Sequence, residues 1–216
     1  GMLTDDQLAS LDEAWTPARA AGVIGAAPVE ALVEHTVWFA RAVCSSFSAS
    51  FDEFHGRIVD VGTGAGLPGV ILAALLPHAE LRLVDASERR LDHARRASRA
   101  LGVGDRVEIA HGRGDELAHD AAWRGTHDVA VARLLGDPAE TIELLAPLVW
   151  PGGVIVTAAA ESAMDRWDAL PVTELPTSSV SWSDSPVGLF ASVNVLAPIP
   201  SSFPRRERKR RQSPLF

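Results

Sequence analysis

The sequence predicts an α/β protein built on a doubly wound, mostly parallel sheet of seven strands. Two observations lead to this fold class. Buried-strand patterns alternate with helical patterns from residue 58 to residue 156, and the first strand pattern runs directly into a glycine-rich turn and a helix. With 216 residues, the chain is long enough for one such domain and too short for two.

An N-terminal helical cap on the sheet is predicted over residues 2–55. Apolar residues recur near helical spacing, first around Leu8 and Trp15 and then from Val29 to Val43. The segment Gly22 to Pro28 interrupts this periodicity, so we expect two helices.

The predicted core, residues 56–200, opens with a strand that leads into the glycine-rich turn. Ile58 to Val61 are mainly β-branched and apolar, as a strand covered on both faces requires. The glycines that follow permit a sharp turn, and a helix then runs from Val70 to Leu76, with Pro68 suited to its first turn. A ligand would lie against free backbone N–H groups at this helix start, which is typical of a nucleotide cradle.

The later elements continue the alternation. Leu81 to Asp85 form the second strand, and Ser87 caps the next helix, which Gly102 ends. Another helix begins at Asp137-Pro138, where a cap residue precedes a proline at the first helical position. The remaining predicted strands are Val107–Ala110, Asp128–Ala132 and Val154–Val156, and a closing β-hairpin pairs Val180–Trp182 with Leu189–Leu196.

The spacing of the glycines indicates which nucleotide-type ligand the turn fits. The dinucleotide spacing G-x-G-x-x-G fits only from Gly64 to Gly69, later than expected after the strand. Read from Gly62, the pattern is an acid, Asp60, followed by three alternating glycines. A carboxylate there repels a pyrophosphate and favours S-adenosylmethionine, which carries an ammonium, a sulfonium and no phosphate. Asp85 is placed to bind ribose hydroxyls, which both kinds of ligand contain, so it does not discriminate between them.

Composition and charge exclude several classes of protein. No apolar run reaches the ~20 residues that would span a bilayer, and the acidic N-terminus is unlike a signal peptide, so we expect a cytoplasmic protein with no membrane partner. Cys44 is the only cysteine, and the seven histidines lack the paired spacing of metal sites, so we expect no metal.

The formal net charge of -8 is unevenly distributed, because the tail, residues 201–216, is basic and the rest of the chain is acidic. An acidic body with one basic arm suits a phosphate contact, so we expect a flexible RNA-binding tail that plays no part in cofactor binding; the alternative is a solvated, disordered end. The candidate RNA-binding residues are Arg205, Arg206, Arg208, Lys209, Arg210 and Arg211.

Several motifs resemble the Rossmann-like S-adenosylmethionine-dependent methyltransferases, and among them the 16S ribosomal RNA guanine-N7 methyltransferase G family, also called glucose-inhibited division protein B. The main motif is Asp60 to Gly69, whose Gly-Leu-Pro-Gly ending is more particular than a generic glycine loop. The segment His111 to Leu117 is similar to that family's His-Gly-Arg turn, and Ala132-Arg133 to its Ser/Ala-Arg after the fourth strand. The turn from Leu148 to Gly153 is also similar.

The resemblance implies methylation of guanine N7 in small-subunit ribosomal RNA, with the RNA or the subunit as partner. Guanine N7 is a lone-pair nucleophile with no proton to remove, so a site without an evident general base is compatible with it. Arg133 is the candidate for positioning the acceptor, and a salt bridge from Arg133 to Asp60 or Asp85 is the structural alternative. The cofactor-binding candidates are Asp60, Gly62, Thr63, Gly64, Gly66, Leu67, Asp85, Ala86, Gly114, Asp115, Glu116 and Arg133.

Departures from the family pattern leave two alternatives open. Thr157-Ala158-Ala159 stands where the family usually has a lysine-glycine, and Val37-Trp38 stands where it usually has an aspartate-serine. One alternative is a divergent methyltransferase with a small-molecule acceptor. The other is a non-catalytic module that binds S-adenosylmethionine or RNA.

Overall fold

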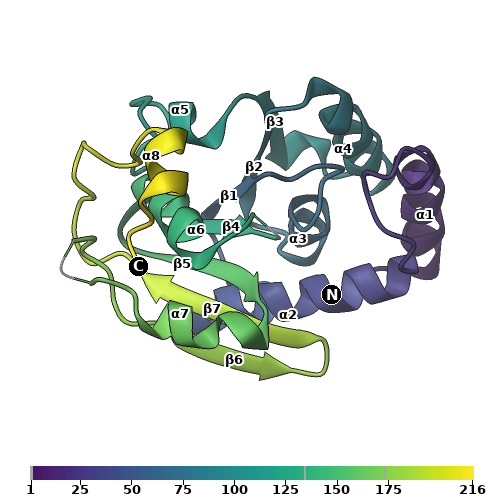
Figure 1. The fold of residues 1–216 in the computed structure, drawn as a ribbon. Helices are drawn as coiled ribbons and strands as arrows, with labels where there is room; N and C mark the ends of the chain where they lie inside the picture. The colour runs from purple at the N-terminus through teal and green to yellow at the C-terminus, as the bar shows by residue number, and fades with distance from the viewer. Residues whose placement is uncertain (1, 134, 173) are drawn as a thin grey trace.

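The computed structural model describes residues 2–133, 135–172 and 174–216. Within these residues the centre of the protein is a seven-stranded sheet in the order β3-β2-β1-β4-β5-β7-β6. The first five strands are parallel, and β7 and β6 are antiparallel to their neighbours. Helices cover both faces of the sheet (Figure 1), so the predicted fold class is confirmed.

The strands follow the predicted order with one large extension. The fifth strand covers eleven residues: pairing of Val149 with β4 begins it before the predicted start at Val154, and pairing with β7 up to Ala159 prolongs it beyond the predicted end at Val156. The hairpin turn is also tighter than predicted, since Ser183 to Ser185 pair with β7 through their backbone. The strands are β1 (Arg57–Val61), β2 (Glu80–Asp85), β3 (Val107–His111), β4 (His127–Ala132), β5 (Val149–Ala159), β6 (Ser181–Ser185) and β7 (Gly188–Asn194).

The helices begin where the cap residues predict. The Ser87 hydroxyl accepts a hydrogen bond from the Arg90 N–H (3.4 Å), and the Asp137 carboxylate accepts one from the Ala139 N–H (2.9 Å). None of the described helices is long and apolar enough to cross a membrane. The helices are α1 (Asp5–Ala20), α2 (Val29–Ser46), α3 (Gly69–Leu75), α4 (Glu88–Ala100), α5 (Gly114–Leu117), α6 (Pro138–Leu145), α7 (Met164–Asp168) and α8 (Glu207–Gln212), with short 3-10 turns at Gly104–Arg106, Ala146–Leu148 and Glu161–Ala163.

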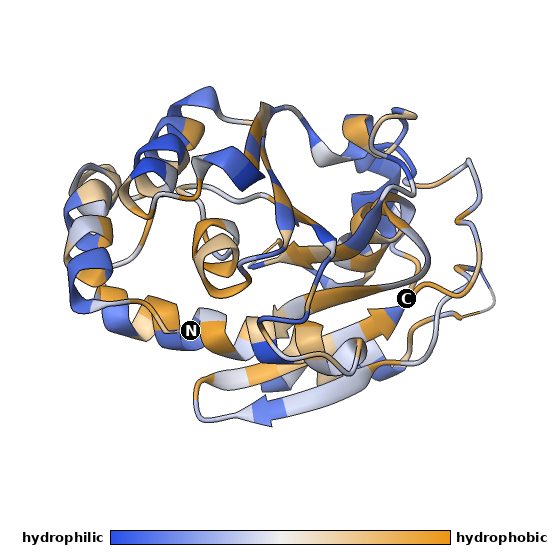
Figure 2. Cartoon of the chain, turned by 180° about the vertical axis from the view of Figure 1, so that it is seen from behind, coloured by the Kyte–Doolittle hydropathy of each residue, from blue (hydrophilic) through white to orange (hydrophobic). Residues whose placement is uncertain are grey.

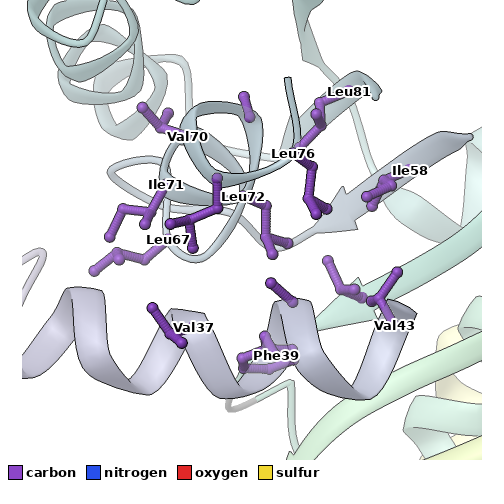
Figure 3. Packing of buried hydrophobic residues seen from close by; sticks show 14 of the residues in the cluster. Val37, Phe39, Val43, Ile58, Leu67, Val70, Ile71, Leu72, Leu76 and Leu81 are labelled. Atoms are coloured by element: carbon purple, nitrogen blue, oxygen red, sulfur yellow. The ribbon is translucent and has the colours of Figure 1, made fainter. Parts of the chain in front are cut away.

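Successive residues of each strand face two different hydrophobic layers. On β4, Val129 and Val131 pack in the layer of α2 and α3, whereas Ala130 and Ala132 pack in the layer of α6. Helix α3 packs against α2, α4 and β2, which explains why it is apolar on all sides (Figure 2). Figure 3 shows this packing, in which Val37 of α2 lies beneath the side chains that α3 and the preceding turn direct toward it.

The tail, residues 201–216, is expected from the sequence to be flexible, but in the structure it packs on the rest of the protein. The Arg124 guanidinium donates hydrogen bonds of 2.7–2.8 Å to the carbonyl oxygens of Ile199, Pro200 and Phe203, and Leu215 and Phe216 pack against the layer of α6. In Figure 1 the tail returns across the molecule and forms α8 next to α5 and α6. The number of charged residues in the tail could not predict this docking, because the residues that contact the tail come from distant parts of the chain.

Candidate functional site

A cavity of about 360 Å³ lies at the carboxyl ends of β1 to β4. Strands β1 and β4 are neighbours in the sheet, and the chain order reverses there, which is where ligands bind in open α/β sheets. Six of the cofactor candidates predicted from the sequence line the cavity: Gly62, Asp85, Ala86, Gly114, Asp115 and Arg133.

Asp60, a predicted cofactor-binding residue, does not line this cavity. Strand alternation directs Val61 toward the cavity and the preceding Asp60 side chain, which is fully buried, toward α3. The Asp60 Oδ2 atom accepts hydrogen bonds from the Thr63 hydroxyl (2.6 Å) and from the Gly69 N–H (2.9 Å). Asp60 therefore joins the glycine turn to the start of α3. The other candidates outside the cavity lining are Thr63, Gly64, Gly66, Leu67 and Glu116.

Gly69 explains the Gly-Leu-Pro-Gly ending of the turn. A Cβ atom at this position would lie 2.1 Å from Leu83 Cδ2 and 2.8 Å from Asp60 Oδ2, so only glycine allows α3 to begin so close to the sheet. This part of the motif is required for packing, whereas Gly62, at the start of the turn, lines the cavity.

The buried Asp60 carboxyl predicts a pH dependence of stability. Burial raises the pKa of Asp60 to about 7, although hydrogen bonds from Thr63 and Gly69 lower it. This folded-state pKa lies above the ordinary value of 3.8. The contribution of the carboxyl group to the free energy of unfolding is therefore complete below about pH 4. It is lost as the pH rises through 7, by about 1.4 kcal/mol per pH unit.

We expect the variant Asp60→Asn to remove this dependence, because its amide oxygen can still accept from Thr63 and Gly69. In thermal denaturation at about pH 5 to about pH 8, the melting temperature of the variant should fall less steeply with pH than that of the parent. Parallel curves for the two proteins would contradict this role of Asp60.

The N–H groups of the glycine turn are occupied by the protein itself, contrary to the prediction of free donors. Gly62 and Thr63 donate to the Val84 carbonyl oxygen (2.8 and 3.0 Å), and Gly64 donates to Asp85 Oδ2 (3.0 Å). The Gly69 N–H is bonded to Asp60, as described above. These bonds leave the turn poorly suited to grip a pyrophosphate.

Gly62 and Asp85 form the side of the cavity next to β1 and β2. Gly62 has a φ of +75°, in the left-handed region that favours glycine, and a Cβ atom there would lie 3.1 Å from Leu135 Cδ1. The Asp85 carboxylate is almost fully buried, accepts a second hydrogen bond from the Ser87 N–H (2.8 Å) and pairs with Arg90 (3.3 Å). Carboxylate oxygens have further lone pairs, so Asp85 can still accept from ribose hydroxyls.

An ion-pair network forms the part of the cavity lining that follows β3. Asp115 pairs with Arg113 (3.1 Å) and with Arg210 of α8 (3.2 Å), and Arg113 also pairs with Glu207 of α8 (2.6 Å). Burial raises the pKa of Asp115, but the bonds and charges of Arg113 and Arg210 outweigh it and hold the pKa below its ordinary value. Several further residues line the cavity that the sequence did not predict for the cofactor site: Arg90, Arg113, Leu135, Glu140, Leu144, Glu207, Arg210 and Arg211.

Arg133 directly follows β4 and also lines the cavity. The predicted alternative, a salt bridge to Asp60 or Asp85, is not formed, because Asp60 bonds to the turn and Asp85 pairs with Arg90. Burial lowers the pKa of the Arg133 guanidinium, while the charge of Asp60 raises it. Burial and the charge of Arg133 lower the pKa of His35 on α2 to about 4, so that imidazole is neutral at pH 7.

The six candidate RNA-binding residues divide into two groups. Arg205 and Arg210 are engaged in ion pairs with Glu143 and Asp115, and Arg211 pairs with Glu207. The charges of these three residues pair with carboxylates of the same chain, so they are not the unpaired cations that the composition of the tail suggested. Arg206, Arg208 and Lys209 have exposed side chains. Among the described residues, no group of three His, Cys, Asp or Glu side chains is placed to hold a metal ion.

The sheet order and the position of the cavity define the fold of the Rossmann-like methyltransferases. The O-methyltransferase TomG from Streptomyces achromogenes, solved in complex with SAM, has this fold: its TM-score is 0.61 at 16% identity, over 91% of this chain and 92% of that chain. Residues 15–180 match the family described as rRNA small subunit methyltransferase G, and the chain belongs to this family.

Two curated members of the family illustrate the extent of the match. The protein of Caldanaerobacter subterraneus subsp. tengcongensis is 30% identical over 173 residues, which cover 74% of this chain and 69% of that protein. The protein of Synechococcus sp. (strain WH7803) is 39% identical over 97 residues, which cover 45% of this chain and 38% of that protein. Both are named ribosomal RNA small subunit methyltransferase G. The chain spans about half the length of the curated relatives it matches.

Proposed function

We propose that this protein is an S-adenosylmethionine-dependent methyltransferase that methylates guanine N7 in 16S ribosomal RNA. The observation that carries the proposal is the cavity at the strand ends, which brings Gly62, Asp85 and Arg133 together in a chain of the rRNA small subunit methyltransferase G family. The relatives' names supply the acceptor, small-subunit ribosomal RNA.

The cavity fits S-adenosylmethionine better than a dinucleotide. The turn offers few free N–H groups for a pyrophosphate, because its donors bond to Val84, Asp85 and Asp60. Asp85 is suited to ribose hydroxyls, and the open backbone of Gly62 leaves room for the ligand beside β1. S-adenosylmethionine supplies an activated methyl group on a sulfonium.

Arg133 is suited to hold an RNA acceptor next to the cofactor cavity. The half-buried guanidinium of Arg133 can donate hydrogen bonds to the acceptor atoms of guanine or to a phosphate. During methyl transfer we assign it to O6 or phosphate, since N7 must remain free as the nucleophile. The neutral imidazole of His35 on α2, which is near enough for the charge of Arg133 to lower its pKa, can accept a hydrogen bond. No side chain needs to remove a proton, so the residues here mainly position the base and exclude water.

The direct test is methyl transfer by the purified chain to small ribosomal subunits that lack the modification, and to naked 16S RNA. Nucleoside mass spectrometry of the product should show 7-methylguanosine. A different methylated nucleoside would reject guanine N7. Binding of S-adenosylmethionine with no transfer to RNA would favour a small-molecule acceptor or a non-catalytic module.

Arg133→Ala is expected to lower turnover about tenfold to hundredfold, the loss expected when a hydrogen-bonded charge is removed. Cofactor affinity, measured by calorimetry with S-adenosylhomocysteine, should change little, because Gly62 and Asp85 remain. Arg89→Ala, which removes an exposed cation on α4, is the control and should retain full turnover. If Arg133→Ala abolishes cofactor binding instead, Arg133 belongs to the cofactor side of the site.

A further inference from the structure

A buried ion pair fixes the position of the tail next to the cavity. The Glu143 side chain on α6 is 1% exposed, and its two oxygens accept hydrogen bonds from Arg205 Nε (2.8 Å) and Nη2 (2.7 Å). The backbone N–H of Arg205 donates to the same carboxylate (2.8 Å). A buried carboxylate without these donors would be strongly unfavourable, so the chain before α8 has a specified docking position.

Helix α8 presents one face to the cavity and another to solvent. Glu207, Arg210 and Arg211 line the cavity, as residues three and four positions apart on a helix share a face. Arg208 and Lys209 lie on the other face and are exposed. The inner face is held by the Glu207–Arg113 pair (2.6 Å) and the Arg210–Asp115 pair (3.2 Å).

Arg210 has a buried donor that the described part of the protein does not use. Its side chain is almost fully buried, Nη1 donates to the Arg205 carbonyl oxygen, and Nη2 donates to Asp115. Its Nε atom is buried with no hydrogen-bond partner among the described residues. Buried polar groups in proteins nearly always have partners, and the Arg210 residue lines the cavity, so its unused donor points to a ligand that supplies the acceptor.

We propose that α8 is a wall of the cofactor pocket and that Arg210 Nε donates a hydrogen bond to the bound S-adenosylmethionine. This inference rests on the proposed function and adds a C-terminal residue to the cofactor site. The acceptor belongs to the adenosine half of the cofactor, because Arg210 stands beside Asp115 on the side of the cavity that follows β3, next to the ribose candidate Asp85. Ring nitrogens and ribose oxygens are suitable acceptors.

The test compares two arginines of the same helix. Calorimetry with S-adenosylhomocysteine should show about tenfold weaker binding for Arg210→Ala than for the full parent chain, the cost of one hydrogen bond from a charged group. Arg208→Ala, which removes an exposed cation from the opposite face, should bind as the parent does. Asp115 keeps Arg113 as a partner in the Arg210→Ala variant, so we expect that variant to fold.

A second measurement needs no substitution. In the parent chain, S-adenosylhomocysteine should slow hydrogen exchange of the α8 amides, residues 207–212. Equal affinities for Arg210→Ala and the parent, with no protection of α8, would overturn the inference while the proposed function stands. Tighter binding by Arg210→Ala would overturn it as well, because α8 would then compete with the ligand. Failure of the parent chain to bind S-adenosylhomocysteine would reject the proposed function together with this inference.

Discussion

Arg205→Ala is expected to lower the free energy of unfolding by about 3 to 5 kcal/mol, among the largest effects of any single substitution in this protein. The variant leaves the Glu143 carboxylate buried on α6 without its cation. It also removes two charge-assisted hydrogen bonds and releases the chain that leads into α8. Urea-induced unfolding, followed by tryptophan fluorescence and circular dichroism, measures the change.

Two further variants isolate the cause. Arg206→Ala removes the neighbouring exposed cation and should change stability by no more than about 0.5 kcal/mol. Adding Glu143→Gln to Arg205→Ala should restore more than half of the loss, because the amide is neutral and still accepts from the backbone N–H of residue 205. If Arg205→Ala is as stable as Arg206→Ala, the tail is not docked through this pair.

Gly62→Val is expected to weaken binding of S-adenosylhomocysteine by at least about a hundredfold, equivalent to about 3 kcal/mol. A φ of +75° is a strained conformation for a β-branched residue. The new side chain would also start 3.1 Å from Leu135 Cδ1, in the wall of the cavity, so its methyl groups must occupy space that the ligand needs. Calorimetry on the folded variant measures the loss.

The variant Gly22→Val is the control for the backbone strain that valine meets at a positive φ. Gly22 has a similar φ of +68° and lies in the turn after α1, where a Cβ atom would have no neighbouring atom within 4 Å. This variant should lose stability through the same strain and keep its affinity for S-adenosylhomocysteine. If both variants bind equally well, the cavity beside Gly62 is not the cofactor site.

The placement of Asp60 follows from strand alternation once the cavity side of the sheet is known. Val61 and Asp60 are adjacent on β1, so they must face opposite layers, and only one of them can reach the cavity. The position of Asp60 ahead of the glycines does not show whether Asp60 or Val61 faces the cavity. That choice depends on which helices cover each face of the sheet, and those helices are distant in the chain.

The sequence by itself determined the order of the elements, the caps at Ser87 and Asp137, the glycine turn and the position of Asp85, because each depends on residues close together in the chain. Only the tertiary structure decided the role of the tail. Arg205 meets Glu143 across 62 residues, and Arg210 meets Asp115 across 95. A run of basic residues has no periodicity that shows which acids it will meet. The basic run therefore suggested a free segment, whereas in the fold Arg205 pairs with Glu143 on α6 and Arg210 pairs with Asp115 in the lining of the cavity.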